Sequence, residues 1–382
     1  MAKVLMKGNE AIGEAAIRAG CVHFFGYPIT PQSEVPEYLA KRLPEVGGKY
    51  VQAESEVAAS NMIYGACGVG VRVLTTSSSP GISLMAEALS YIAACELPVV
   101  LVNIMRGGPG LGGILPAQGD YLQATKGTAH GDFKLLVLAP ASVQEAVDLM
   151  GLAFQLAEKY LTPVMLIGDG MIGQMMEPVE FPPEGQAKPL DPGDWALTGC
   201  AGRPRRVVNS LYLDPELLNQ HNLKLKAKYA RIAEAEQRWE LYNCDAPYDV
   251  LITAFGMVAR ICKTAIEELK AEGISVGLFR PISVNPFPTR ACREAIDKAR
   301  RVLDLEMNMG QMLVDIEAAA QGTKPIDFFG TAGGVVPSPD DVIAQVRKSL
   351  AAAGVEPAPA RAPSKPAAKA PKGAGQAKRA KK

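Results

Sequence analysis

The sequence predicts an α/β protein with two doubly wound parallel sheets, and three observations support this fold class. Short β-rich runs alternate with helical segments from residue 8 to about residue 175, and the same alternation returns from residue 247 to about residue 350. A proline-rich and polar stretch separates the two blocks. Strands that alternate regularly with helices form parallel sheets covered by helices on both faces. The chain of 382 residues is long enough for two such units.

The strands expected in the first block are short runs rich in valine, leucine, isoleucine and phenylalanine. They cover residues 21–26, 72–76, 97–105, 134–140 and 162–168. Apolar side chains at helical spacing predict helices around them. The expected helices cover residues 9–20, 35–43, 56–68, 83–96 and 142–160.

The second block repeats this pattern after a connector. Its expected strands are 248–256, 274–283, 300–308 and 325–330, and its expected helices are 257–273, 289–299 and 311–322. Within the connector, residues 177–194 are expected to be extended and 217–242 to form one long polar helix with few core positions. The resulting division is a first unit 1–180, a connector 181–246, a second unit 247–350 and a tail 351–382. The Ala, Pro and Lys composition of the tail predicts a disordered basic extension.

Composition argues against several classes of protein. The formal net charge is zero and no uninterrupted apolar run reaches about 18 residues, so neither nucleic acid nor a membrane is an expected partner. The N-terminus lacks an apolar signal-peptide core, which favours a cytoplasmic location. The seven cysteines are scattered without a CxxC pair, so we expect mostly small buried cysteines and no metal or iron–sulfur site in this chain. His130 is expected at the surface.

Ligands of parallel α/β sheets bind beyond the carboxyl ends of the strands. Four segments are candidates for that position. They are GYPITPQSE (26–34), VQAESE (51–56), TTSSSPG (75–81) and MRGGPGLGG (105–113).

The first segment places Thr30 between Pro28 and Pro31. One interpretation is helix capping, in which Thr30 is the N-cap with Pro31 at the first helical position, or Ser33 caps instead. The other is a loop that forms part of a site, because Pro28 additionally restricts the backbone on its side of the threonine. The residues alone leave both open.

The second segment carries two carboxylates, Glu54 and Glu56, at the start of a nearly uncharged helix. Acids in a first turn gain a few tenths of a kcal/mol from the helix dipole. Because residues 57–70 carry no charge, we expect this helix to be buried all round. A carboxylate at the head of a buried helix is expected to have a specific partner.

The third and fourth segments suit an anionic ligand. TTSSSPG offers hydroxyl groups ahead of an apolar helix, which fits anion binding or a serine N-cap. MRGGPGLGG matches GxGxxG, but Pro116 interrupts a following helix, so a flexible glycine loop that carries one cation is the better interpretation. Arg106 at the strand end is then a candidate bidentate clamp for a substrate carboxylate, with a surface arginine as the alternative. GDG at 168–170 lacks the asparagine of a thiamine diphosphate magnesium motif about 25 residues later, so Asp169 is not expected to bind Mg²⁺.

Four stretches together resemble the α subunits of the 2-oxoacid:ferredoxin oxidoreductases. They are YPITPQSE, AESEVAASNMIYGA, SSSPGISLMAEALSYIAACELPVVLVNIMRGGPGLGG and APASVQEAVDLMGLAFQLAEKYLTPVMLIGDG, and the resemblance covers about residues 5–345. It is strongest to the branched-chain 2-oxoacid (2-oxoisovalerate) enzymes, followed by the 2-oxoglutarate enzymes. It implies a pyrimidine-type thiamine diphosphate-binding domain followed by a transketolase-C-like α/β domain.

The resemblance also implies an activity that needs partner chains. A 2-oxoacid would be oxidatively decarboxylated to acyl-CoA and CO₂ while ferredoxin is reduced. Thiamine diphosphate would be shared with a β subunit that carries the diphosphate and Mg²⁺ motif and an iron–sulfur cluster, and γ and ferredoxin-like δ subunits are further possible partners. Ferredoxin, coenzyme A and the 2-oxoacid complete the expected partners.

The resemblance assigns roles to individual residues. Glu56 resembles the glutamate that hydrogen-bonds N1′ of the aminopyrimidine, with Glu54 as second choice. Thr30 resembles the substrate-binding threonine and Arg106 the arginine that binds the substrate carboxylate. Ser79 stands where many relatives have the glycine of TSGPG, so its side chain is expected beside the substrate. The cofactor contacts expected besides Glu56 are Tyr27, Pro28, Ile29 and Gly81.

Three other functions fit parts of the sequence. The glycine loop could belong to a nucleotide-binding regulatory subunit, although GK[ST] is missing. A structural or interaction protein could act through the basic tail. A non-oxidative 2-oxoacid decarboxylase would use thiamine diphosphate without an electron acceptor.

Overall fold

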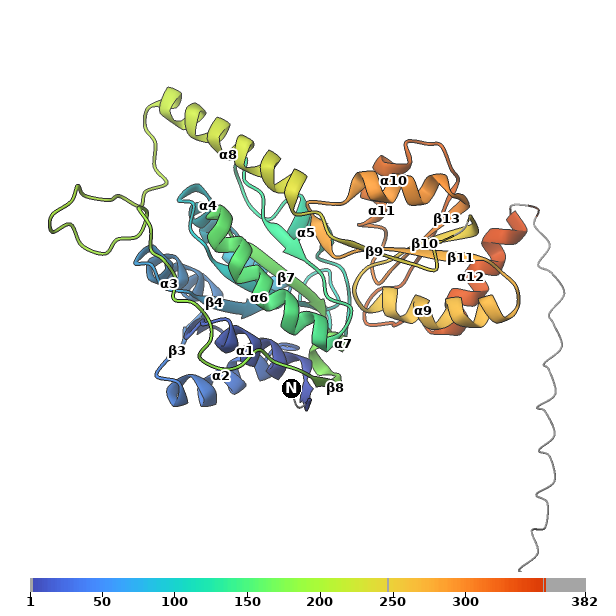
Figure 1. Cartoon of the computed structure of the whole chain (residues 1–382), viewed down its shortest axis with the longest axis horizontal. Helices are drawn as coiled ribbons and strands as arrows, with labels where there is room; N and C mark the ends of the chain where they lie inside the picture. Colours follow the sequence, from blue (N-terminus) through green and yellow to red (C-terminus); the bar gives the residue numbers. More distant parts are fainter. Residues whose placement is uncertain (1–2, 246, 353, 355–382) are drawn as a thin grey trace, which may run out of the picture.

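The computed structural model describes residues 3–245, 247–352 and 354. Two α/β units lie side by side, the first drawn in blue to green and the second mainly in orange (Figure 1). Each unit has its own sheet, with seven strands in the first and five in the second. The expected α/β class with two sheets is confirmed.

The first sheet has the strand order β12-β6-β7-β5-β4-β2-β3. All neighbouring pairs from β6 to β3 are parallel, and β12 is antiparallel to β6 at the edge. The strands are β2 (His23–Gly26), β3 (Lys49–Gln52), β4 (Leu74–Ser77), β5 (Val100–Met105), β6 (Leu136–Leu138), β7 (Val164–Asp169) and β12 (Ser283–Asn285).

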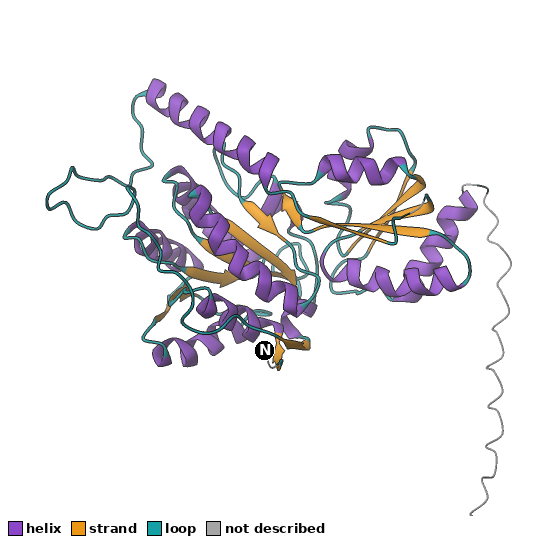
Figure 2. Cartoon of the chain, viewed as in Figure 1, coloured by secondary structure: helices purple, strands orange, loops and turns teal. Residues whose placement is uncertain are grey.

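Helices cover both faces of this sheet (Figure 2). One layer contains α1 (Gly8–Arg18), α2 (Glu34–Glu45) and α6 (Val143–Tyr160), and the other contains α3 (Glu56–Gly68), α4 (Pro80–Ala94) and α5 (Tyr121–Thr125). The central strand β5 shows the alternation of a sheet buried on both sides. Leu101 and Met105 pack into the cluster with α3 and α4, whereas Val100 and Val102 pack into the cluster with α1 and α6.

The second sheet has the order β14-β13-β10-β11-β9, parallel except for the antiparallel edge strand β9. Its strands are β9 (Trp239–Tyr242), β10 (Tyr248–Thr253), β11 (Val276–Pro281), β13 (Ala299–Glu306) and β14 (Ile326–Gly330). One face packs against α9 (Gly256–Ala271) and α12 (Pro339–Ala352), and the other against α10 (Thr289–Asp297) and α11 (Leu313–Ala320).

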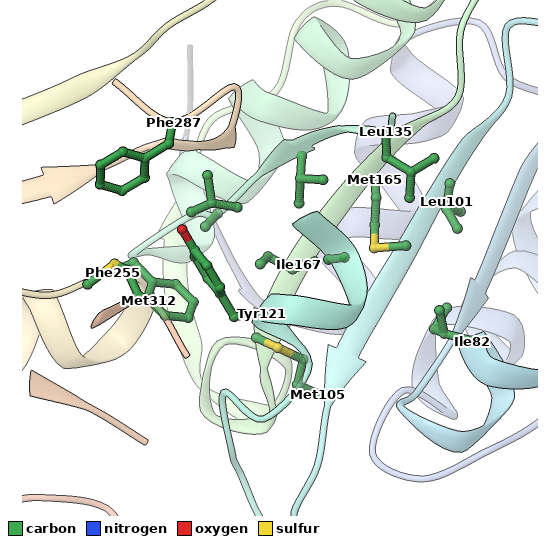
Figure 3. Packing of buried hydrophobic residues seen from close by; sticks show 14 of the residues in the cluster. Ile82, Leu101, Met105, Tyr121, Leu135, Met165, Ile167, Phe255, Phe287 and Met312 are labelled. Atoms are coloured by element: carbon green, nitrogen blue, oxygen red, sulfur yellow. The ribbon is translucent and has the colours of Figure 1, made fainter. Parts of the chain in front are cut away.

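One hydrophobic cluster continues from the first unit into the second. The ring of Tyr121 on α5 lies 5.5 Å from that of Phe255, and both belong to a buried cluster with Phe287 and Met312 of the second unit. Figure 3 shows these side chains together with Met105 of β5. The Tyr121 hydroxyl also donates to Asp315 Oδ2 at 2.5 Å. The two units therefore share a core.

The long polar helix expected at 217–242 is wrong at its carboxyl end. Helix α8 covers Pro215–Ala235, and Trp239–Tyr242 form strand β9, which pairs antiparallel with β11. The side chains of WELY alternate between exposed and half-buried, which is the period of a strand and not of a helix. The helix packs on the first unit through Leu225, Tyr229 and Ile232.

Several other elements differ from expectation, among them strand β3 (Lys49–Gln52), which was not among the expected strands. The strand expected at 274–283 splits into β11 of the second sheet and β12 of the first. β1 (Val4–Lys7) and β8 (Met176–Val179) form a small antiparallel pair that was not predicted. Helix α12 runs to Ala352, past the expected start of the tail, and the rest of that tail lies outside the described residues.

The cysteines are mostly buried, as expected. Cys200 is exposed, Cys95 is half-buried and the other five are buried. Across the described residues, no helix combines the length and apolar character needed to cross a membrane. In the same ranges, no group of three or more His, Cys, Asp and Glu side chains is placed to hold a metal ion.

Candidate active site

The four candidate segments meet beyond the carboxyl ends of β3, β2, β4 and β5, which are neighbours in the first sheet. Arg106 follows β5, and its Nη1 donates to the carbonyl oxygen of Thr30 at 2.9 Å. The Arg106 N–H donates to Ser79 Oγ at 3.1 Å. Glu56 at the start of α3 lies against Gly81 at the start of α4. The fold thus brings together the residues that the sequence singled out.

The loop between β2 and α2 is held through its backbone. Asn9 Nδ2 and Gln174 Nε2 donate to the carbonyl oxygen of Pro31 at 2.8 and 3.2 Å. Gln32 is fully buried and its Oε1 accepts from Thr76 Oγ1 at the end of β4. These bonds fix the path of the loop and leave the side chain of Thr30 exposed.

The capping interpretation of this loop is wrong. Helix α2 begins at Glu34, and the residue at its N-cap position, Ser33, has helical backbone angles and makes no side-chain cap hydrogen bond. Thr30 lies outside the helix. Of the two interpretations, the one that remains is that this loop, which carries Tyr27, Pro28 and Ile29, forms part of a site.

Glu56 occupies the first position of α3 and is 5% exposed. Ser55 caps the helix by accepting from the N–H of Ala58 at 3.1 Å. A side chain at residue 81 would place its Cβ 2.7 Å from Glu56 Oε1 and 2.0 Å from Ser77 Oγ, so any residue other than glycine would displace these two side chains. Glu54 is exposed ahead of the helix, which makes it the weaker candidate for a buried carboxyl.

Helix α3 is not buried all round, contrary to expectation. Val57, Asn61 and Gly65 are exposed, and their spacing of four residues places them on one side of the helix. The lack of charge in this helix therefore reflects an uncharged side that stays exposed, and not complete burial.

The end of β4 carries buried hydroxyl groups without partners. Ser77 Oγ and Ser78 Oγ are both inaccessible and have no hydrogen-bond partner among the described residues. Buried polar atoms are nearly always paired in proteins, so these two hydroxyls beside a buried carboxyl stand out as groups for which the described residues supply no partner.

Ser79 does not cap α4 although it stands at its N-cap position. Its φ of 30° lies in the left-handed region that favours glycine, and its hydroxyl donates to Asp120 Oδ2 at 2.6 Å. The serine N-cap interpretation of TTSSSPG is therefore wrong, since this hydroxyl is used for a contact with another segment.

Asp120 and Asn103 are two polar residues that the sequence did not reveal. Asn103 Nδ2 donates to Asp120 Oδ2 at 2.9 Å, and Asn103 Oδ1 accepts from the Ser79 N–H at 3.0 Å. Burial raises the pKa of the Asp120 carboxyl, which the hydrogen bonds from Ser79 and Asn103 and the Arg106 charge oppose. The only sequence signal was the position of Asp120 shortly after the glycine loop.

Arg106 is 7% exposed, so the surface alternative is wrong. Its Nη1 and Nη2 donate to the carbonyl oxygens of Thr30 and Leu111, at 2.9 and 3.2 Å. Its buried Nε has no partner among the described residues. A guanidinium has five N–H donors, so donors remain for a carboxylate.

A cleft of about 550 Å³ opens beside Ser79 and separates the glycine loop from the second unit. Among the described residues that line it, Asp120 is the one charged side chain and none is lysine or arginine. The lining consists of Ser79, Pro80, Ser83, Gly107, Gly108, Pro109, Gly110, Leu111, Ala117, Gly119, Asp120, Gln123, Met307, Asn308, Met309, Gln311, Ala332 and Gly333.

Asp169 of the GDG sequence has a structural role. Its Oδ1 caps α7 (Gly170–Gln174) by accepting from Met171 and Ile172, and its Oδ2 accepts from the N–H of Met257 in the second unit. Complete burial raises its pKa to about 6. His130 is exposed, as expected, with its ring edge against Tyr91.

Two family profiles match this chain. Residues 14–238 match the thiamine diphosphate-binding region of the pyruvate flavodoxin/ferredoxin oxidoreductases. Residues 248–342 match core domain II of pyruvate:ferredoxin oxidoreductase. The first match covers most of the first unit together with α8 and the connector up to residue 238, and the second match covers most of the second unit.

Similar proteins are known by sequence and by structure. The chain is 45% identical to the ketoisovalerate oxidoreductase subunit VorB of Methanothermobacter thermautotrophicus, over 91% of this chain and 98% of that protein. It is 36% identical to the 2-oxoglutarate synthase subunit KorA of Archaeoglobus fulgidus, over 86% and 94% of the two chains. A 2-oxoglutarate:ferredoxin oxidoreductase from Magnetococcus marinus superimposes with a TM-score of 0.81 at 26% identity, covering 91% of this chain and 65% of that one. A split-gene transketolase shares the fold, with a TM-score of 0.56 at 16% identity.

Proposed function

Because the chain belongs to the pyruvate flavodoxin/ferredoxin oxidoreductase family, we propose that it is the α subunit of a heteromeric, thiamine diphosphate-dependent 2-oxoacid:ferredoxin oxidoreductase. The complex would convert a 2-oxoacid and coenzyme A to acyl-CoA and CO₂ and pass two electrons to ferredoxin. The observation that carries the proposal is the meeting of Glu56, Gly81, Thr30 and Arg106 at one edge of the parallel sheet.

The residues around Glu56 fit the aminopyrimidine end of thiamine diphosphate. The site has a buried carboxyl, a glycine where any Cβ would collide, and the unpaired hydroxyl of Ser77. When bound, thiamine diphosphate supplies the nucleophilic carbon that attacks the 2-oxo group and the electron sink for decarboxylation. Glu56 would exchange a proton with the ring nitrogen N1′ and so set the protonation of the pyrimidine. The backbone at Tyr27, Pro28 and Ile29 would form a second wall.

Arg106 and Thr30 would bind the substrate. The Arg106 guanidinium is anchored by two carbonyl oxygens, which take one N–H of Nη1 and one of Nη2, so each Nη keeps a second N–H. Charge-assisted hydrogen bonds from these remaining donors would hold the 2-oxoacid carboxylate. The exposed Thr30 side chain, which caps no helix, is free to donate its hydroxyl hydrogen to the same substrate.

A branched-chain monocarboxylic substrate such as 2-oxoisovalerate is favoured over 2-oxoglutarate. The cleft beside Ser79 offers no lysine or arginine among its described lining residues, and the carboxylate of Asp120 would repel a second substrate carboxylate. The name of the VorB relative agrees with this choice. The KorA relatives keep 2-oxoglutarate as the alternative.

A separate β subunit would hold the diphosphate, Mg²⁺ and the iron–sulfur cluster. The carboxylate of Asp169, the acid of the GDG sequence, already accepts hydrogen bonds from three backbone N–H groups. Asp169 would therefore not serve as a ligand to Mg²⁺. Other subunits with iron–sulfur clusters would carry the electrons to ferredoxin, and the complex would work in the cytoplasm.

Activity of the assembled complex tests this proposal. The chain is co-expressed with candidate β, γ and δ partner chains and purified without oxygen. Reduction of a viologen dye is then followed with 2-oxoisovalerate, 2-oxoglutarate or pyruvate, with and without coenzyme A. We expect reduction that requires coenzyme A and the partner chains, with the highest kcat/KM for 2-oxoisovalerate. Decarboxylation without an electron acceptor would instead indicate a non-oxidative decarboxylase.

A further inference from the structure

The carboxylate of Asp120 does not serve the helix at whose start it stands. Asp120 is at the N-cap position of α5 and makes no side-chain cap hydrogen bond. Its Oδ2 instead accepts from the hydroxyl of Ser79 at 2.6 Å and from the amide of Asn103 at 2.9 Å. Two donors from two other segments thus converge on one carboxylate oxygen at the wall of the cleft.

Ser79 needs this support because of its backbone. Its φ of 30° is unfavourable for a residue with a Cβ. The Ser79 N–H is fixed by Asn103 Oδ1, and the same hydroxyl that binds Asp120 accepts from the N–H of Arg106. A short chain of hydrogen bonds therefore runs from Asp120 through Ser79 to the backbone of the proposed substrate-binding arginine.

The segment that carries Asp120 is fixed by the second unit. Gln118 exchanges backbone and side-chain hydrogen bonds with Met307, and its Nε2 donates to the carbonyl oxygen of Phe255 at 2.9 Å. Gln311 Nε2 donates to the carbonyl oxygen of Gly119 at 2.6 Å. The position of Asp120 is therefore set by the second unit, whereas the groups that it holds belong to the first.

We propose that Asp120 is a positioning residue of the substrate site, which holds Ser79 in its strained conformation and through Ser79 orients Arg106 toward the 2-oxoacid. The second unit thereby supports substrate binding through the position that it gives to Asp120. This inference rests on the proposed function, because it assumes that Arg106 binds the substrate carboxylate.

Two replacements of Asp120 distinguish a positioning role of this residue from a role that needs its charge or a proton transfer. Both accepted hydrogen bonds fall on Oδ2, and an amide oxygen can accept them as well. Asp120→Ala should raise KM for the 2-oxoacid at least tenfold with a smaller effect on kcat, and Asp120→Asn should restore most of that loss. Equal losses in Asp120→Asn and Asp120→Ala would show that the charge is required and would overturn the positioning role. A wild-type KM in Asp120→Ala would overturn it as well.

Ser79 tests the same link from its other end. Ser79→Ala removes the hydroxyl and should raise KM by a factor similar to that of Asp120→Ala, which keeps the proposal testable if Asp120→Ala does not assemble. The double variant should be no worse than either single variant, because the link is already broken. If the double variant instead raised KM by the product of the two single factors, the two residues would act independently and the proposal would fail.

Two controls make the result specific. Asp214→Ala removes an exposed aspartate that only caps α8, and KM should stay at the wild-type value. Assembly of each variant with its partner chains is measured by size-exclusion chromatography, so that a folding defect is separated from a change in KM. If the wild-type complex oxidises no 2-oxoacid, the proposed function itself fails; if it does and KM is unchanged in Asp120→Ala and Ser79→Ala, only the role of Asp120 fails.

Discussion

At the scale of single residues, the site depends on the absence of a Cβ at residue 81. A Cβ added at Gly81 would collide with both Ser77 Oγ and Glu56 Oε1. The φ of Gly81 does not lie in the left-handed region, so alanine would be accepted by the backbone. The steric conflict alone explains the need for glycine, and it ties the start of α4 to the carboxylate at the start of α3.

Gly81→Ala tests this contact. The added methyl group should push the Glu56 carboxylate and Ser77 from their positions, and we expect the affinity of the assembled complex for thiamine diphosphate to fall at least tenfold. Gly151→Ala is the matched control, since residue 151 is also helical and has open space around its Cα. Equilibrium dialysis or calorimetric titration with thiamine diphosphate measures the affinity. Equal affinities in the two variants would contradict the contact.

Asp169 gives a pH-dependent prediction. Burial raises its pKa from 3.8 to about 6, so the folded state binds more protons at this site than the unfolded state between these values. The favourable contribution of the neutral carboxyl is thus complete below about pH 4 and is lost as the pH rises through about 6. Relative to wild type, the unfolding free energy of Asp169→Asn should rise by up to about 3 kcal/mol across this range. Denaturant unfolding at several pH values measures it, and a constant difference would refute the shift.

At the scale of elements, α3 places Glu56 through its first turn. The Ser55 hydroxyl accepts from the N–H of Ala58 and fixes where the helix begins. Loss of an N-cap hydroxyl costs about 1 kcal/mol. Ser55→Ala should lower the unfolding free energy by that amount. It should also lower kcat while KM for the 2-oxoacid changes less, because Glu56 would act on the cofactor and not on the substrate. Ser142→Ala removes the same type of cap from α6 and should affect stability alone.

Most helices and parallel strands could be predicted because their period is visible in the sequence. β5 and β7 are mainly apolar runs, and α6 has apolar residues at helical spacing. Edge strands were missed because WELY in β9 and the short β1 and β8 have weak sequence patterns. These segments become strands through pairing with a neighbouring strand in the folded chain. The burial of α3 was overestimated, because an uncharged surface can also remain open.

The candidate site was predictable in part for a similar reason. Strand ends indicate where ligands bind in parallel sheets, so the segments that carry Glu56, Ser79 and Arg106 could be picked from their positions, and the family resemblance then singled out Glu56 and Ser79. The roles of Asp120 and Asn103 could not, because their contact with Ser79 joins segments that are 41 and 24 residues apart. Only the folded chain brings these groups into contact.

At the scale of the whole molecule, polar and apolar contacts make the two units one body. Arg280 of β11 is 5% exposed, and its two Nη atoms donate to the Glu145 carboxylate of α6 at 2.8 Å. Its Nε donates to Glu240 of β9 at 2.7 Å. Together with the shared core around Tyr121, this ion pair fixes the second unit against the first, as the proposed role of Asp120 requires.

Breaking this ion pair should weaken the whole chain. Arg280→Ala leaves the partly buried Glu145 carboxylate without its cation and leaves Glu240 with Lys263 alone. The loss of a partner from a buried ion pair costs about 3–5 kcal/mol. Arg290→Ala removes an exposed pair with Glu294, for which less than about 1 kcal/mol is expected. Denaturant unfolding should show one transition in wild type and a lower midpoint in Arg280→Ala. Two separate transitions in wild type would contradict a shared core.

The central claim is that Glu56 activates thiamine diphosphate for a partner-dependent oxidation of a 2-oxoacid. The most direct test is anaerobic, coenzyme A-dependent dye reduction by the complex that carries Glu56→Gln, compared with wild type at saturating cofactor. Glutamine keeps the shape of the side chain but cannot exchange a proton with the ring nitrogen. We predict a loss of turnover of at least a hundredfold with the heteromer still assembled, and turnover near the wild-type rate would contradict the account.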